Sequence, residues 1–135
     1  MAEASITYFE DLKIVGQICP PPDAIYPDGK KEYYRVVKSN PANSECFISH
    51  RAKFPEMVFD DECVARAISL SDSIGSIING YFKTPARKKK NRLIGIVRLQ
   101  PSDGLIKQTG VVGHHSWWRS KTFDVSSVII QQVEI

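Results

Sequence analysis

The sequence lacks any hydrophobic run that could cross a bilayer, which takes about 20 consecutive apolar residues. Its longest apolar stretches, RLIGIVRL and SSVII, have the length of strands. The N-terminus carries two acidic residues in its first ten and no basic segment of the kind that opens a secretory signal peptide. These absences argue against a membrane protein, and we expect a cytoplasmic one.

Cysteine is scarce, and its pattern excludes two common kinds of small domain. Cys19, Cys46 and Cys63 are an odd number, and no two of them form a C-x-x-C pair. This pattern argues against a disulfide framework and against a structural zinc site. The histidines show neither H-x-H nor H-x-x-x-H spacing. We therefore expect buried, unpaired cysteines, no metal ion and no other cofactor.

The chain shows no internal repeat and no low-complexity segment that would divide it into several units. Its 135 residues, 42% hydrophobic and 24% charged, are typical of one globular domain that can bury a core. The stretch CPPPDAIYPDGKK disrupts regular structure, because its prolines favour an extended chain and its Pro-Asp-Gly favours a turn. We predict an N-terminal arm at residues 1–31 and a compact domain at residues 32–135.

Strand patterns outnumber helix patterns. Alternating, β-branched or aromatic stretches predict strands at 32–38, 65–70, 92–100, 104–110 and 125–135. A short helix is expected after a cap at Asn43 or Ser44, and a second over 72–82 with Ser71 as its cap. The expected fold is α+β, a mostly antiparallel or mixed sheet with one or two short helices. One core is predicted, from Tyr34, Val36, Ile68, Ile74, Ile77, Ile78, Ile96, Val97, Leu99, Val128 and Ile130.

The segment GHHSWWRSK at 113–121 concentrates two histidines, two tryptophans and two cations. In an extended chain, alternate side chains face opposite ways, so that one face carries His115, Trp117 and Arg119 and the other carries His114, Ser116 and Trp118. We predict a strand at the sheet edge, with one tryptophan in the core and the other exposed beside its histidine. That histidine could act as a general acid or base, or hold a phosphate with Arg119 and Lys121. The alternative is that the whole segment only packs.

A second concentration of charge lies at residues 83–92, although the net charge of the chain is only +3. Six of these ten residues are cations, namely Lys83, Arg87, Lys88, Lys89, Lys90 and Arg92. Such a loop attracts polyanions, and an exposed Trp117 or Trp118 nearby would offer a surface on which bases stack. The plain alternative is a solvated loop, and no established nucleic-acid motif is present.

Three short motifs occur in the order found in the Arg-Ser-Glu class of mono-ADP-ribosyltransferases, and the chain resembles that class in this respect. They are Arg35 in a predicted strand, Ser69-x-Ser71, and Gln132-x-Glu134 in the last predicted strand. The resemblance implies that Arg35 binds the pyrophosphate of NAD and that the serines shape a nicotinamide pocket. It also implies that Glu134 stabilises the positively charged ribose. Glu134 departs from the pattern, because it is the next-to-last residue here.

A broader resemblance covers residues 33–124. The stretches YYRVVKSNPANSECFISH, CVARAISLSDSIGSI, IGIVRLQPSDGLIKQTG and GHHSWWRSKTFD are similar to a group of short bacterial proteins without an assigned activity. This resemblance implies a bacterial source and a compact single domain, and it implies no mechanism.

Two functional hypotheses follow, and the oligomeric state stays open. The first is a small bacterial interaction protein that binds nucleic acid, as a polyanion, or a protein partner. Its surface would comprise Lys88, Lys89, Lys90, Arg92, Trp117, Trp118 and Arg119. The alternative is a small enzyme of ADP-ribosyltransferase-like or nuclease-like type, with Arg35, His114, His115 and Glu134 as candidate catalytic residues. A pocket in which these residues converge would favour the enzyme.

Overall fold

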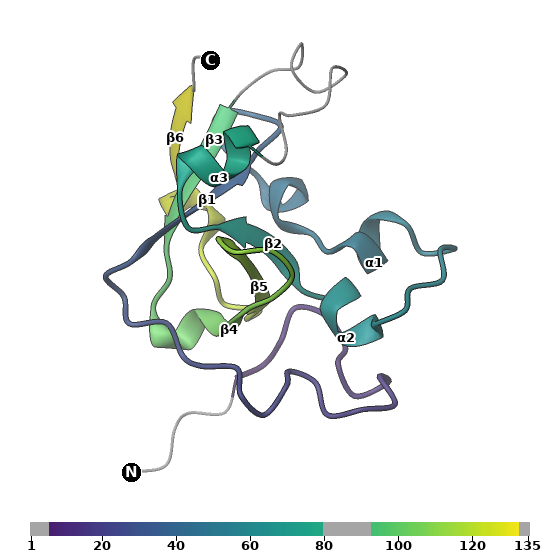
Figure 1. The fold of residues 1–135 in the computed structure, drawn as a ribbon. Coiled ribbons are helices and arrows are strands. Elements are labelled where there is room, and N and C mark those ends of the chain that lie inside the picture. Colours follow the sequence, from purple (N-terminus) through teal and green to yellow (C-terminus); the bar gives the residue numbers. More distant parts are fainter. Residues whose placement is uncertain (1–5, 80–92, 133–135) are drawn as a thin grey trace.

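The computed structural model describes residues 6–79 and 93–132, and these form one six-stranded antiparallel sheet with short helices (Figure 1). The strands are β1 (Glu32–Val36), β2 (Ile68–Ser71), β3 (Leu93–Arg98), β4 (Gly104–Gln108), β5 (His114–Arg119) and β6 (Ile129–Gln132). The α-helices are α1 (His50–Lys53), α2 (Glu62–Ala65) and α3 (Ile74–Asn79). Turns of 3₁₀ helix lie at Ser44–Phe47, Pro101–Asp103 and Val125–Ser127. The predicted α+β class is confirmed.

The strand order in the sheet is β4-β5-β2-β1-β3-β6, and all neighbours are antiparallel. The segment with the paired histidines and tryptophans is β5, and it lies between β4 and β2. Our prediction of an edge strand was therefore wrong. The reason is topological: the chain pairs β5 on one side with its hairpin neighbour β4 and on the other with the distant strand β2.

The helices are short and depend on caps rather than on long apolar periodicity. Asn43 caps the first 3₁₀ turn, as predicted, by accepting a hydrogen bond from the backbone N–H of Glu45 at 3.0 Å. Ser71 is the last residue of β2 rather than a helix cap, and Ser73 accepts from the backbone N–H of Ser76 instead. Helices α1 and α2 were not predicted, because four residues are too few to show a 3.6-residue period.

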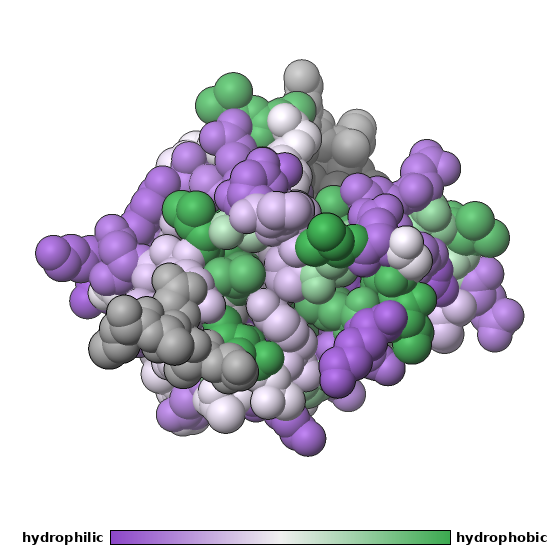
Figure 2. Space-filling model, turned by 90° about the horizontal axis from the view of Figure 1, so that it is seen from below, coloured by the Kyte–Doolittle hydropathy of each residue, from purple (hydrophilic) through white to green (hydrophobic). Residues whose placement is uncertain are grey.

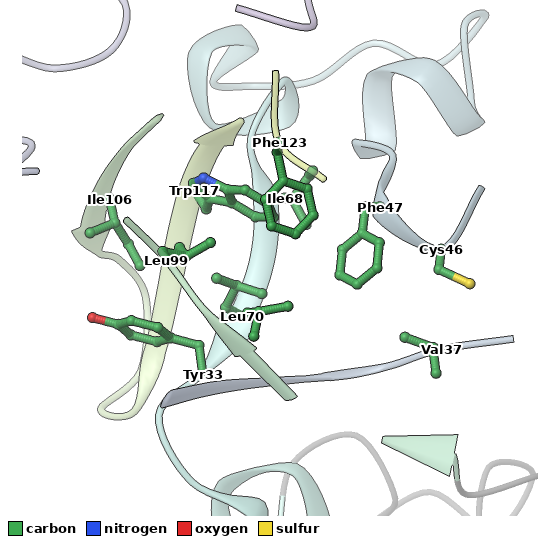
Figure 3. Close-up of a cluster of buried hydrophobic side chains, with 11 residues drawn as sticks. Tyr33, Val37, Cys46, Phe47, Ile68, Leu70, Leu99, Ile106, Trp117 and Phe123 are labelled. Carbon is green, nitrogen blue, oxygen red and sulfur yellow. The ribbon is translucent and has the colours of Figure 1, made fainter. Parts of the chain in front are cut away.

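The apolar side chains form clusters on both faces of the sheet, which differs from the single core that we predicted. The main cluster is drawn in Figure 3 and contains Tyr33, Val37, Cys46, Phe47, Ile68, Leu70, Val97, Leu99, Ile106, Trp117 and Phe123. A smaller one joins α3 to the other face of the sheet through Ile77 and Ile94, with Tyr34, Val36, Ile74 and Ile78 packed against them. Alternation along β1 explains the division, because Tyr33 and Tyr34 point to opposite faces.

The N-terminal arm covers a further part of the second face. Its Leu12 packs with Trp118, Cys63 and Ala67, and this cluster also receives Tyr8, Val15, Cys19, Ala24 and Val64. Beyond the Ile68–Trp117 pair of β2 and β5, the arm bonds to the end of β5 and to the residues that follow it. The backbone N–H of Phe9 donates to the Arg119 carbonyl at 2.9 Å, and the backbone N–H of Lys121 donates to the Thr7 carbonyl at 2.7 Å. The arm is therefore part of the folded domain. Seen from its side, the surface shows apolar residues in separate patches (Figure 2).

A disulfide joins the arm to the body of the molecule. Cys19 in the arm is bonded to Cys63 in α2, and Cys46 is the free, buried cysteine. The expectation that all three cysteines are unpaired was therefore wrong for two of them. Spacing along the chain did not reveal the pair, because the docking of the arm brings together residues that are 44 positions apart.

The first prediction concerns the two tryptophans. Replacing either Trp117 or Trp118 by Ala should lower the free energy of unfolding by about 3–5 kcal/mol, because both side chains are fully buried. Urea unfolding followed by circular dichroism measures the change. The Phe variants are the controls and should cost less. A cost below about 1 kcal/mol for Trp118→Ala would contradict the docking of the arm on that face.

Candidate functional site

Both tryptophans have internal hydrogen-bond partners, so neither offers a surface to a ligand. Trp117 Nε1 donates to the Asp103 carbonyl and Trp118 Nε1 donates to the Cys63 carbonyl, each at 2.9 Å. The two side chains do point to opposite faces, as predicted. The prediction that one of them is exposed was wrong, because the arm covers the second face. The predicted nucleic-acid surface therefore has no exposed tryptophan on which bases could stack.

Arg119 is also buried, with 7% of its surface exposed. Its guanidinium lies between two rings, 4.3 Å from the centroid of Phe9 and 5.5 Å from that of Phe123, and donates to the Phe47 carbonyl at 3.2 Å. Burial lowers the pKa of this guanidinium from its ordinary value. These contacts hold the arm against the core, and they leave Arg119 without the open surface that phosphate binding requires.

Arg35 ties three backbone segments together. Its Nε donates to the Cys46 carbonyl at 2.7 Å, and its terminal nitrogens donate to the Ser69 carbonyl at 2.8 Å and the Ile48 carbonyl at 3.4 Å. Strands β1 and β2 share the pair Tyr34–Ser71. The guanidinium of Arg35 in β1 therefore adds a second connection between these two strands, through its bond to the Ser69 carbonyl of β2. The observed contacts of Arg35 are structural, and a role in binding NAD stays a prediction.

This role of Arg35 gives the second prediction. Arg35→Met should lower the free energy of unfolding by at least about 2 kcal/mol, because it leaves three backbone carbonyls without their donor. Arg98→Met is the matched control. It removes an exposed ion pair to Glu32 at 3.1 Å and should cost less than about 1 kcal/mol. Equal costs in urea unfolding would contradict a structural role for Arg35.

The two consecutive histidines have different surroundings, because their side chains point to opposite faces of β5. His114 is half-buried, and its Nδ1 lies 3.0 Å from the Thr109 carbonyl and 3.2 Å from the Thr109 hydroxyl. That hydroxyl is in turn 2.7 Å from the hydroxyl of Ser116. The carbonyl contact requires a proton on Nδ1 of His114, so this histidine belongs to a polar network at the β4–β5 turn. It does not meet His115.

His115 lines a cavity of about 360 Å³ between the arm and the sheet. The walls are Asp23, Ile25, Tyr26, Pro27, Asp28 and Lys31 from the arm side, and Tyr33, Ile106, Lys107, Gln108 and His115 from the strands. Tyr33 and Ile106 lie at one end of the main apolar cluster, so the cavity adjoins that end of the core (Figure 3). Of the candidate catalytic residues in the described chain, His115 is the one in this cavity.

The imidazole of His115 has a carboxylate on one side and a cation and a phenol nearby. Its Nε2 is buried, lies 3.7 Å from Asp72 Oδ2, and has no hydrogen-bond partner among the described residues. Burial lowers the pKa of His115, Lys31 lowers it further, and Asp72 opposes both. The Tyr33 ring meets the imidazole edge to face at 5.3 Å between centroids. Burial, together with Asp28 and Asp72, raises the pKa of Tyr33, which therefore stays protonated.

The other charged side chains that line the cavity differ in whether they have an ion-pair or hydrogen-bond partner. Asp23 pairs with Lys107 at 3.0 Å, and Asp28 accepts hydrogen bonds from the backbone N–H groups of Lys30 at 2.8 Å and Lys31 at 3.1 Å. The Lys31 ammonium lies 5.4 Å above the Tyr33 ring, and no carboxylate of the described chain is within ion-pair distance of it. Lys31 is therefore the cavity lysine that has no ion-pair partner among the described residues, whereas Lys107 is paired.

A second hollow, of about 430 Å³, is lined by residues of β1, β3 and β6 and of the turns between strands, and its polar groups are paired differently. Its charged residues bond to one another or to the backbone: Arg98 to Glu32 at 3.1 Å, and Asp103 to the backbone N–H of Gln100 at 2.8 Å. Burial raises the pKa of Asp103, although its bond from Gln100 opposes this. No histidine lines this hollow. The His115 cavity is the stronger candidate site.

Several candidate residues lie outside the described part of the chain. Lys88, Lys89, Lys90 and Arg92 of the basic segment and Glu134 are among them, so the polyanion surface and the Arg-Ser-Glu arrangement remain predictions. Within residues 6–79 and 93–132, no three side chains gather that could ligate a metal. None of the helices described there has the length and apolar character needed to cross a membrane.

The sequence analysis missed most of the groups that surround His115. Lys31 and Tyr33 both follow the Pro-Asp-Gly turn in YPDGKKEYY, and this cationic and aromatic segment after the turn was the available signal. Asp72 gave no signal, because its closeness to His115 follows from the pairing of β2 with β5. Comparison of the chain with family models, curated proteins and solved structures finds no match.

The third prediction concerns pH. The folded pKa of His115 lies below the unfolded value of about 6.5, so the unfolded chain takes up the proton first as the pH falls. Stability should therefore fall as the pH drops below 6.5, and His115→Gln should flatten that decline. The pKa of His50 is lowered as well, by partial burial and by Arg35 and Lys53. His50→Gln is therefore the control that measures how much His50 contributes to the loss of stability at low pH. An unchanged decline in His115→Gln would place His115 in open solvent.

Proposed function

We propose that the protein binds a small anionic molecule in the His115 cavity and that His115 exchanges a proton with it. The observation that carries the proposal is a partly buried imidazole that lines a cavity of about 360 Å³ beside a carboxylate. Cavities of this size hold small ligands, and histidines with shifted pKa values are common in functional sites.

The preference for an anion follows from the donors. Lys31 contributes an ammonium, Gln108 an amide and Tyr33 a protonated phenol, whereas Asp23 and Asp28 are already engaged. A phosphate or carboxylate could accept from these groups and would stabilise the protonated form of His115.

The apolar walls favour a ligand that has an apolar part as well. Ile25 and Ile106 are neighbours in the lining of the cavity, because their backbones pair there, and the Tyr33 ring adds a flat surface. An apolar or aromatic body that carries one phosphate or carboxylate group fits this combination. The Asp72–His115 pair would then serve to orient the imidazole and hold its proton.

The fourth prediction tests the pocket by NMR of the histidine nitrogens. The protein is titrated with inorganic phosphate, a nucleoside monophosphate, an aromatic carboxylate and a single-stranded oligonucleotide. The small anions should shift the His115 signals and raise its pKa. Lys31→Gln should weaken their binding by about tenfold, as expected for loss of one charged hydrogen bond. Lys38→Gln changes an exposed lysine outside the cavity and should bind as the wild type does.

Two results would contradict the proposal. The first is that no small anion moves the His115 signals. The second is that the oligonucleotide alone binds and that Lys31→Gln leaves its affinity unchanged. If combined substitution of Lys88, Lys89 and Lys90 by Gln then abolished oligonucleotide binding and flattened its salt dependence, the polyanion hypothesis would replace the pocket.

A further inference from the structure

The arm segment 20–31 forms one wall of the His115 cavity and is fixed at both of its ends. The Cys19–Cys63 disulfide holds one end, and β1 begins immediately after the other. This segment supplies six of the eleven residues that line the cavity. The cavity therefore has this wall only while the segment lies against the sheet.

Between these two ends, the segment is bonded to the sheet and to the turn after β3, where Gln100 Nε2 donates to the Gly29 carbonyl at 3.5 Å. Ile25 and Ile106 exchange two backbone hydrogen bonds of 2.9 and 2.8 Å, and the Asp23–Lys107 ion pair spans 3.0 Å. The Ile25 side chain is 64% exposed, and the ion pair lies at the surface. Surface ion pairs contribute little to stability. The disulfide is the covalent restraint close to this wall, and beside it Gln17 Nε2 donates to the Asp61 carboxylate at 3.2 Å.

The main apolar cluster does not include the disulfide, whereas Cys63 packs with Trp118 of β5 in a smaller cluster. Neither Cys19 nor Cys63 belongs to the main apolar cluster, whereas the free Cys46 is buried within it. The bond joins an arm to a short helix rather than one core strand to another. Its loss should therefore act first on the arm and only weakly on the sheet.

We propose that the Cys19–Cys63 disulfide is a redox latch that holds the arm closed over the His115 cavity. In the oxidised protein the wall formed by residues 20–31 is in place. Reduction removes the covalent restraint at its N-terminal end, so that the wall opens and the ligand loses half of its preformed surroundings. The effect on ligand binding rests on the proposed function, whereas the release of the arm does not.

The reducing step requires a thiol from outside the protein, such as a small dithiol. A thiolate attacks the sulfur of Cys19, which is half-buried, and the thiolate of the fully buried Cys63 leaves. The second thiol of the reductant then displaces Cys19. The protein S–S bond breaks, two S–H bonds form with two protons and two electrons from the dithiol, and the dithiol becomes a disulfide.

Amide hydrogen exchange of the full chain tests the latch in the oxidised protein and in the protein reduced by dithiothreitol. Amides of residues 23–26 and 28–31 should exchange at least about tenfold faster after reduction, while those of β2 and β5 should stay protected. Cys19→Ser should exchange like the reduced protein without any reductant. Cys46→Ser, the matched control, should still respond to reduction. Equal arm protection in both states, or equal loss of protection in arm and sheet, overturns the latch.

Inorganic phosphate binding, followed at the His115 nitrogens in both redox states, separates the two proposals. Affinity about tenfold lower in the reduced protein supports gating of the cavity. If the arm opens and phosphate binds equally in both states, the gating is wrong and the proposed pocket survives. If the arm opens and phosphate shifts His115 in neither state, the proposed function for this anion is wrong and the latch survives.

Discussion

Two adjacent tryptophans in a central strand require that both faces of the sheet be covered. Successive side chains of β5 point in opposite directions, so Trp117 and Trp118 cannot share one core. The main cluster receives the first, and the arm together with α2 covers the second. Arg119 strengthens this arrangement, because its guanidinium lies between Phe9 of the arm and Phe123 of the body. The docking of the arm and the position of the disulfide both serve to bury Trp118.

The same alternation separates the two histidines and assigns them different chemistry. His114 turns toward Thr109 and becomes part of a network of hydroxyls. His115 turns toward Tyr33 and Asp72, where burial and Lys31 favour its neutral form. Two histidines that are consecutive in the sequence therefore do not lie in the same site. The one that faces the cavity carries the proposed function.

The sequence predicted the strands well and the site only in part. Patterns confined to five or six residues, such as EYYRV and LIGIVR, were sufficient to identify β1 and β3. Features that depend on distant pairing were missed: the inner position of β5, the burial of Trp118 and the Cys19–Cys63 bond. His115 was among the candidates, but Asp72 became its neighbour only through the register of β2 against β5. Local patterns do not contain that register.

The docking of the arm also sets an order for folding during synthesis. Phe9 leaves the ribosome before its partner Arg119, which is made more than a hundred residues later. At about 5–20 residues per second, the arm waits on the order of ten seconds before its docking surface exists. During that interval its apolar residues and Cys19 are accessible to other proteins and to thiols. The arm therefore cannot complete its docking until Arg119 has been synthesised.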